Sequence, residues 1–182
     1  MAKPSFFTGK YAIKGVEDAM KRAAVSALNK FAARIVVMLR KRSLAKYNIS
    51  RRAFDRVVSV DRAKMGKYRV TILVDRVPIS LSEFNPIKSN KGVTVEIIRG
   101  KPVEIEGAFI GTRKVGRVGS IGNLEVFQRK GKERLPIKVT TGTRIADMLR
   151  SNEMYDAIKV KYREEFADLL TSEFKFFNSK RS

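Results

Sequence analysis

Seven cations between Gly107 and Ile137 are the side chains whose type and spacing best suit them to bind a partner. They lie in a glycine-rich loop and on the second of the two apolar, strand-like stretches that flank it. Arginine and lysine at this density attract phosphates or carboxylates. The segment contains no acid pair at catalytic spacing, no cysteine and no histidine. The candidate contact residues are Arg113, Lys114, Arg117, Arg129, Lys130, Lys132 and Arg134.

The glycines of this loop could be mistaken for a phosphate-binding motif. They occupy positions 111, 116, 119 and 122, among Arg113, Lys114 and Arg117. A P-loop needs a lysine and then a serine or threonine at the end of the glycine run, followed by a helix, and the sequence offers neither feature. We therefore expect residues 111–123 to form a flexible basic loop that becomes ordered on assembly, rather than a nucleotide site.

The rest of the sequence is equally poor in catalytic residues. Without cysteine, disulfides and thiolate zinc sites are excluded, and without histidine the commonest general base and neutral metal ligand are missing. A nuclease-type metal site needs a cluster of carboxylates, whereas Asp55, Asp61 and Asp75 lie singly along the sequence. We predict no enzymatic activity, no catalytic residues, no metal and no cofactor.

The net charge of +21 is concentrated in two parts of the chain. Residues 1–52 hold 13 Lys and Arg against two acids and residues 86–144 hold 13 against five, whereas residues 145–182 hold seven of each. Such a field attracts DNA, RNA or an acidic protein surface. It also suits a solvated surface that keeps the protein soluble, so charge alone does not separate these alternatives.

Length and hydropathy predict one soluble domain. The 182 residues, 43% of them hydrophobic, can bury a single core. No run approaches the roughly 18 apolar residues of a bilayer span, and the first residues lack the order of a secretory signal. We expect a protein made in the cytoplasm that contacts no membrane.

Helical periodicity is found at both ends of the chain. A long amphipathic helix is predicted from about Tyr11 to Tyr47, and Ser50 is suited to cap a short helix over Arg51–Arg56. The polar face of the long helix is basic, which suits either solvent or a counter-charge on a partner. From about Arg144 the helical period returns and continues to about Phe174, with an aromatic stripe that we expect to close over a sheet.

The middle of the chain has the alternation typical of strands. Val77–Pro86 is an extended crossing segment held by Leu81 and Phe84, since its prolines exclude a central strand. The sequence thus predicts an α+β fold: a long N-terminal amphipathic helix, a central and mostly antiparallel β-sheet of hairpins, and a C-terminal helix packing on the sheet. We expect a single domain over residues 1–182, with an N-terminal arm at 1–10 and a C-terminal tail at 175–182. The predicted strands are Val57–Val60 and Tyr68–Val74, Lys91–Ile98 and Val103–Ile110, and Leu124–Arg129.

Five short motifs, in this order over about residues 20 to 150, resemble those of the phage minor tail protein Z family, also described as tail completion proteins. The chain departs from the family pattern after the last motif, where Thr141-Gly142-Thr143-Arg144 keeps a glycine but lacks a proline. The motifs are Ala27-Leu28-Asn29-Lys30, Ile79 to Phe84, Lys91-Gly92-Val93, Gly107 to Ile110, and Val126 to Ile137.

The resemblance implies a structural protein of the tailed-phage virion, located at the head-proximal end of the tail, that helps complete the tail and join it to the DNA-filled head. It implies a homo-oligomer, as a hexameric ring, next to neck and tail-tube or tail-terminator proteins. It also implies non-specific contact with phage DNA in the channel, and residence in the host cytoplasm during assembly. The seven cations are then candidate assembly or DNA-channel contacts.

The alternative is a free basic nucleic-acid-binding protein. That class would need aromatic residues spaced on an exposed sheet face or a helix-turn-helix signature, and the sequence shows neither.

Overall fold

The structure is a computed structural model that describes the chain except for residues 1–4, 9–17, 113–123, 132, 134 and 180–182. It confirms the α+β class, with long helices at both ends and several small antiparallel sheets between them. The chain divides into two compact units. The prediction of a single domain stays a prediction. No helix among the described residues has both the length and the apolar composition needed to cross a bilayer.

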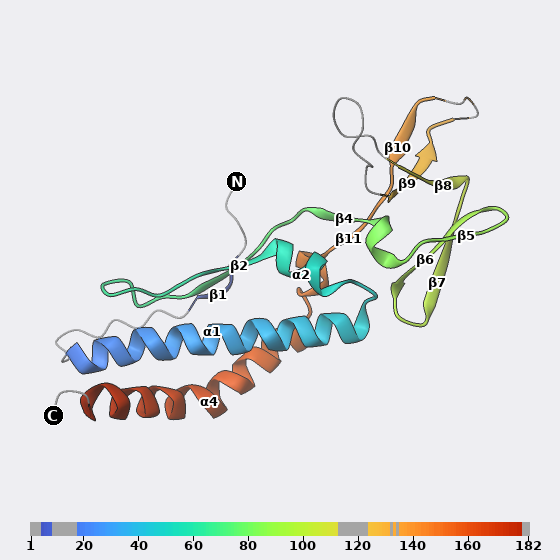
Figure 1. Cartoon of the computed structure of the whole chain (residues 1–182). Coiled ribbons are helices and arrows are strands. Elements are labelled where there is room, and N and C mark those ends of the chain that lie inside the picture. The colour runs from blue at the N-terminus through green and yellow to red at the C-terminus, as the bar shows by residue number, and fades with distance from the viewer. Residues whose placement is uncertain (1–4, 9–17, 113–123, 132, 134, 180–182) are drawn as a thin grey trace. The chain divides into compact units, whose positions relative to one another are not determined.

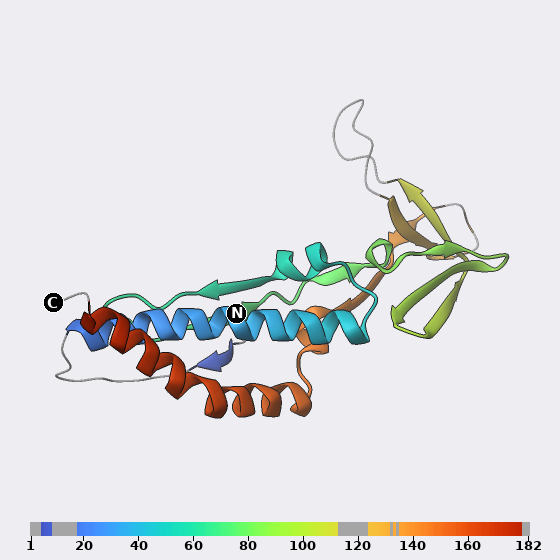
Figure 2. The same cartoon turned by 60° about the horizontal axis from the view of Figure 1, so that its bottom comes forward.

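The first unit contains Met1–Lys41, Arg56–Asp75 and Leu149–Ser182. Its antiparallel sheet has the order β1-β3-β2, so part of the expected N-terminal arm is a strand. In both views α4 runs beside α1, and the β2–β3 hairpin extends along α1 (Figures 1 and 2). Its elements are β1 (Ser5–Thr8), most of α1 (Asp18–Lys46), β2 (Val58–Asp61), β3 (Thr71–Val74) and α4 (Asn152–Ser179).

The motif Ala27-Leu28-Asn29-Lys30 lies on α1 and contacts two other elements of the unit. Ala27 and Leu28 are buried in the core. Asn29 bonds the backbone of Ala63, just after β2: its Nδ2 donates to the Ala63 carbonyl at 3.1 Å, and the Ala63 amide donates to its Oδ1 at 2.9 Å. Lys30 points to α4, where its Nζ donates to Glu173 Oε1 at 2.5 Å. One motif therefore ties α1 to the hairpin and to the C-terminal helix.

The aromatic stripe of α4 packs against α1. The Phe31 ring makes edge-to-face contacts with Tyr162, at a centroid distance of 5.8 Å, and with Phe166, at 5.6 Å. Such pairs add to the free energy of burying the rings. The sequence predicted that this aromatic stripe packs on a sheet, and the structure shows that it also packs on helix α1. The helix also continues to Ser179, five residues beyond its predicted end, so most of the expected tail is helical.

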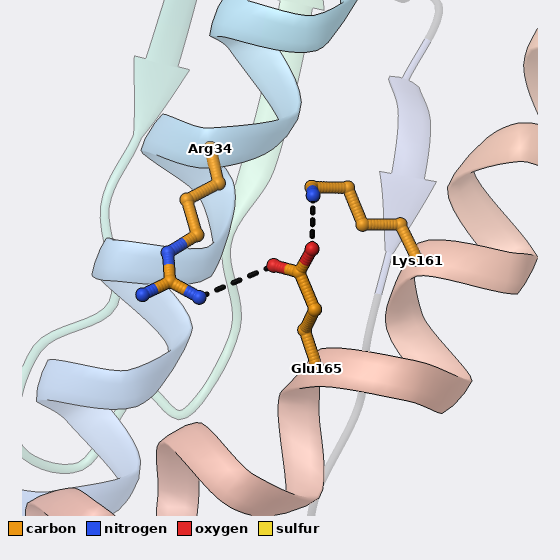
Figure 3. A network of polar contacts seen from close by, with 3 residues as sticks. All are labelled: Arg34, Lys161 and Glu165. Atoms are coloured by element: carbon orange, nitrogen blue, oxygen red, sulfur yellow. Dashed lines mark hydrogen bonds and ion pairs between the residues drawn. The ribbon is translucent and has the colours of Figure 1, made fainter.

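Carboxylates of α4 supply counter-charges to the basic face of α1. Arg34 Nη1 donates to Glu165 Oε2 at 3.1 Å, and Lys161 bonds the other oxygen of the same carboxylate (Figure 3). Hydrogen bonds from Lys161 and Arg34 lower the pKa of Glu165, although burial opposes them. Two turns further along α4, Glu173 is only 6% exposed and accepts from Lys30 and from Ser26 Oγ, the latter at 2.6 Å.

The second unit contains Arg42–Asp55 and Arg76–Met148. Its core includes Phe54, Leu81, Phe84, Val93 and Val95, each at most 2% exposed. The unit has three small sheets, of order β5-β6-β7, β10-β9-β8 and β11-β4. The unit includes the end of α1 and the first residues of α2 (Arg51–Val57), which ends in the first unit. Its other elements are β4 (Pro78–Ser80), the 3₁₀ helix η1 (Leu81–Phe84), β5 (Ile87–Lys88), β6 (Gly92–Ile98), β7 (Lys101–Glu106), β8 (Ala108–Thr112), β9 (Leu124–Arg129), β10 (Ile137–Val139), β11 (Thr141–Arg144) and α3 (Ile145–Met148).

In this unit the predicted Ser50 N-cap is confirmed, whereas two segments predicted to be extended are interrupted. Helix α2 (Arg51–Val57) follows Ser50, whose Oγ accepts from the Ala53 amide at 3.0 Å, as expected of an N-cap. The first interrupted segment is Val77–Pro86, in which Leu81–Phe84 form the 3₁₀ helix η1. The predicted strand from Val103 to Ile110 is instead two strands, because Gly107 adopts φ +68° and turns the chain between β7 and β8. A left-handed residue interrupts a strand, and glycine adopts this conformation without steric cost.

Replacement of Gly92 by alanine should destabilise the second unit. A Cβ at this position would lie 2.1 Å from the Ile105 carbonyl oxygen on β7, a backbone atom that cannot move without breaking the ladder. We expect a loss of about 1–3 kcal/mol in the free energy of unfolding, measured by urea denaturation followed by circular dichroism. Gly131→Ala is the control because no atom lies within 4 Å of its added Cβ. Equal stability of the two variants would contradict this packing.

The stability of the α1–α4 pair should depend on Glu173 ionisation. Burial alone would raise its pKa, but hydrogen bonds from Lys30 and Ser26 and the charge of Lys30 lower the pKa below 4.5. Since the folded-state pKa is the lower one, the stabilisation is present above about pH 4.5 and is lost as the pH falls through the folded value. Glu173→Gln should therefore cost about 1 kcal/mol at pH 6 and less below pH 4.5, by thermal unfolding. The exposed Glu164→Gln is the control, and a cost independent of pH would show that the charge is unimportant.

Candidate assembly surface

Three strands of the second unit, which begin at Ala108, Leu124 and Ile137, form the antiparallel sheet β10-β9-β8. Phe109 pairs with Phe127 across β8 and β9, and Arg129 pairs with Ile137 across β9 and β10. Directly paired residues, and residues two apart on one strand, have side chains on the same face of a sheet. Phe109, Phe127, Arg129 and Ile137 therefore share one face, which we call the apolar–basic face.

The two phenylalanines give this face its rigid part. Their rings stack at a centroid distance of 5.7 Å with an interplanar angle of 26°. Phe127 is 8% exposed, and its ring lies over Gly111 on the neighbouring strand, where an added Cβ would be 3.3 Å away. Phe109 is 37% exposed and Ile137 39% exposed. The buried Phe127 ring thus holds Phe109 in place, while Phe109 and Ile137 remain partly exposed to solvent.

A hollow of about 500 Å³ lies where β8 begins and β9 ends. Gln128 fixes one wall, because its Nε2 donates to the Glu106 carbonyl at 3.2 Å. The Gly107 amide donates to the Lys91 carbonyl at 2.9 Å, which anchors the turn between β7 and β8. The lining residues are Glu106, Gly107, Ala108, Phe109, Gln128, Arg129 and Gly131.

Of the seven cations predicted to make contacts, the structure describes Arg129 and Lys130. Both are exposed, and they follow one another at the end of β9. The Lys130 amide donates to the Pro136 carbonyl at 3.0 Å, next to the pairing of Arg129 with Ile137. Their predicted role is not tested by this placement. The other five, Arg113, Lys114, Arg117, Lys132 and Arg134, lie outside the described residues, as does most of the loop predicted at 111–123.

The electrostatics of this sheet favour anions. Among described residues, neither Arg129 nor Lys130 forms an ion pair with a carboxylate. The Glu125 carboxylate on β9 instead accepts a hydrogen bond from Ser80 Oγ on β4, and Glu106 is the carboxylate in the hollow. In the described part of the chain no three or more acidic, histidine or cysteine side chains gather in a way that could hold a metal ion. The arrangement suits binding of a partner with negative charge and some apolar surface.

The cations are visible in the sequence, whereas strand β10 and the hollow beside them are not. Strand β10 has only three residues, too few to give a periodic signal in the sequence. The hollow depends on the turn at Gly107, which the sequence placed inside a continuous strand. A Gly between two alternating runs was the available signal, because glycine inside a strand pattern often marks a bend.

The family model described as prophage minor tail protein Z (GPZ) matches residues 12–177, a range that includes described residues of both units. No curated protein and no solved structure matches the chain.

Substitutions on β9 should separate structural from surface roles. Phe127→Ala removes a buried ring that stacks on Phe109, and we expect a loss of roughly 3–5 kcal/mol in the free energy of unfolding. Arg129→Glu, two residues away on the same face but exposed, should change the free energy of unfolding by no more than about 0.5 kcal/mol. Urea denaturation of both variants measures the contrast, and a large loss in Arg129→Glu would mean that the arginine serves the fold.

Proposed function

The chain belongs to the prophage minor tail protein Z family, whose model leaves out only its first 11 and last five residues, and from this premise we propose where in the particle it acts. Family membership makes it a structural protein of a phage tail. We propose that copies form a ring, of six subunits, at the head-proximal end of the tail. There the ring completes the tail and helps join it to the DNA-filled head, without enzymatic activity.

The observation that carries this proposal is the exposed apolar–basic face of the β10-β9-β8 sheet. A subunit that joins two assemblies needs a rigid patch that remains uncovered until its partner arrives. Stacked Phe109 and Phe127 supply the rigid part, and Arg129 supplies the charge. The proposed partners are further copies of the chain, neighbouring neck proteins, and tail-tube or tail-terminator proteins.

The charge of +21 supports a location near DNA. Non-specific contact with DNA in the channel requires only cations that face the phosphates, with no base-reading motif. Exposed cations of α1, such as Arg22, Lys41 and Arg42, are suited to that contact. We also propose that the protein assembles in the host cytoplasm and then remains in the virion.

The same charge favours one competing function, a free nucleic-acid-binding protein. Binding of the isolated chain to bare DNA separates the two. A ring component should bind weakly and without sequence preference before assembly, whereas a free DNA-binding protein should bind tightly on its own, with an affinity that falls steeply with salt.

Negative-stain electron microscopy of the tagged chain mixed with purified tails that lack it tests the location. The proposal expects label at the head-proximal tip of the tail. Label along the tube or at the distal end would refute it.

Reversal of Lys130, Lys132 and Arg134 to glutamate should abolish head–tail joining while the isolated chain stays folded. The change replaces three cations of the proposed contact surface with anions, and like-charge contacts across an interface are strongly unfavourable. Infectious yield after complementation measures the effect. The control reverses Lys88, Lys91 and Lys101, which are exposed elsewhere in the same unit and give the same change in net charge. Normal yield from the first variant, or equal loss from both, would refute the assignment of this surface.

A further inference from the structure

We propose that the hollow at the start of β8 and the end of β9, together with the apolar–basic face beside it, binds an acidic and partly apolar segment of a different protein of the virion. The inference rests on the proposed function, because it takes the neighbour from the same particle. It goes further by naming the chemistry of the partner and the residues that recognise it.

The hollow is already formed before any partner binds. Its volume of about 500 Å³ is in the range of sites that hold small ligands or a few side chains. Gln128 bonds the Glu106 carbonyl and Gly107 bonds the Lys91 carbonyl, so two independent hydrogen bonds fix the wall. Binding of a partner segment would therefore require little conformational ordering of the site.

Arg129 sets the preference for a carboxylate. It lines the hollow, is exposed, and has no ion pair with a carboxylate in the described part of the chain. A guanidinium group binds a carboxylate through two parallel hydrogen bonds, which gives direction as well as strength. Lys130, the next residue, is also exposed.

The apolar side chains favour a protein partner over nucleic acid. Phe109 and Ile137 are more than one third exposed on the same face as Arg129, and burial of such groups stabilises a protein contact. Glu106 in the wall opposes a regular line of phosphates. A peptide can place a carboxylate at Arg129, an apolar side chain at Phe109 and a hydrogen-bond donor at Glu106.

The total charge argues against a second copy of the chain as the occupant. Each copy carries 39 Lys and Arg against 18 Asp and Glu. A second copy would bring more positive charge to a face that already carries Arg129, whereas an acidic neighbour compensates that charge.

Photo-crosslinking in assembled particles tests the inference. Phe109→p-benzoyl-phenylalanine places the reactive group in the hollow, and Leu124→p-benzoyl-phenylalanine is the control on the same sheet. Leu124 is 59% exposed, but its position in the β9 pairing puts it on the opposite face. Both full-length variants are expressed in place of the wild-type chain in an induced prophage, and mass spectrometry identifies the attached peptides.

The expected result is a cross-link from position 109 to a segment of another virion protein in which Asp and Glu outnumber Lys and Arg. Arg129→Glu in the same chain should reduce its yield about tenfold, and Arg129→Lys should reduce it less, because the lysine keeps the charge but loses the paired hydrogen bonds. Attachment to DNA or to a second copy, the same attachment from position 124, or no attachment would each overturn the inference.

The location experiment separates failure of this inference from failure of the proposed function. If the chain labels the head-proximal tip but position 109 attaches to DNA or to a second copy, the inference is wrong and the function stands. If position 109 attaches to an acidic segment of another virion protein while the label lies elsewhere on the tail, the recognition chemistry stands and the location is wrong.

Discussion

A shortage of carboxylates governs how this chain folds and what its surface can do. It has 18 Asp and Glu against 39 Lys and Arg, and at least nine of those carboxylates accept hydrogen bonds or form ion pairs within the chain. Glu173 and Glu165 join α4 to α1, while Glu125 joins β9 to β4. Because the acids serve internal contacts, the excess cations remain at the surface without compensation from the protein itself.

This constraint connects the fold to assembly. Copies of a strongly positive chain repel one another in free solution. Their association becomes more favourable where negative charge is already present. DNA and acidic neighbouring proteins both provide that charge. The apolar groups around Arg129 add selectivity, since phosphates gain nothing from contact with Phe109 and Ile137. The positive charge thus favours binding next to DNA or acidic proteins in the particle. The apolar side chains favour a protein neighbour over DNA.

The parts of the fold that could be predicted from sequence are those specified by neighbouring residues. Helical periodicity indicated both long helices, and Ser50 marked the start of α2. Long-range pairings could not be predicted in this way. The sequence showed that the basic face of the first helix suits either solvent or a counter-charge, but nothing local to Lys30 points to Glu173, 143 positions further along the chain.

The candidate site was predictable only in part for the same reason. The cations are visible in the sequence, whereas the hollow requires β8 and β9 to pair across the intervening loop and Gly107 to turn the chain. The five family motifs illustrate the difference. Asn29 and Lys30 tie elements together, Gly92 permits close strand pairing, and Phe127 fills the sheet. These residues serve the fold, so the motifs identify the family through its structure more than through its contact surface.

We propose that the protein joins its particle through the apolar–basic face of the β10-β9-β8 sheet. A cryo-electron microscopy reconstruction of the head–tail junction tests the claim most directly. We predict that Phe109 and Ile137 are covered there and that Arg129 contacts a carboxylate of a neighbouring protein. A reconstruction in which this face is exposed to solvent, with the subunit held by other surfaces, would contradict it.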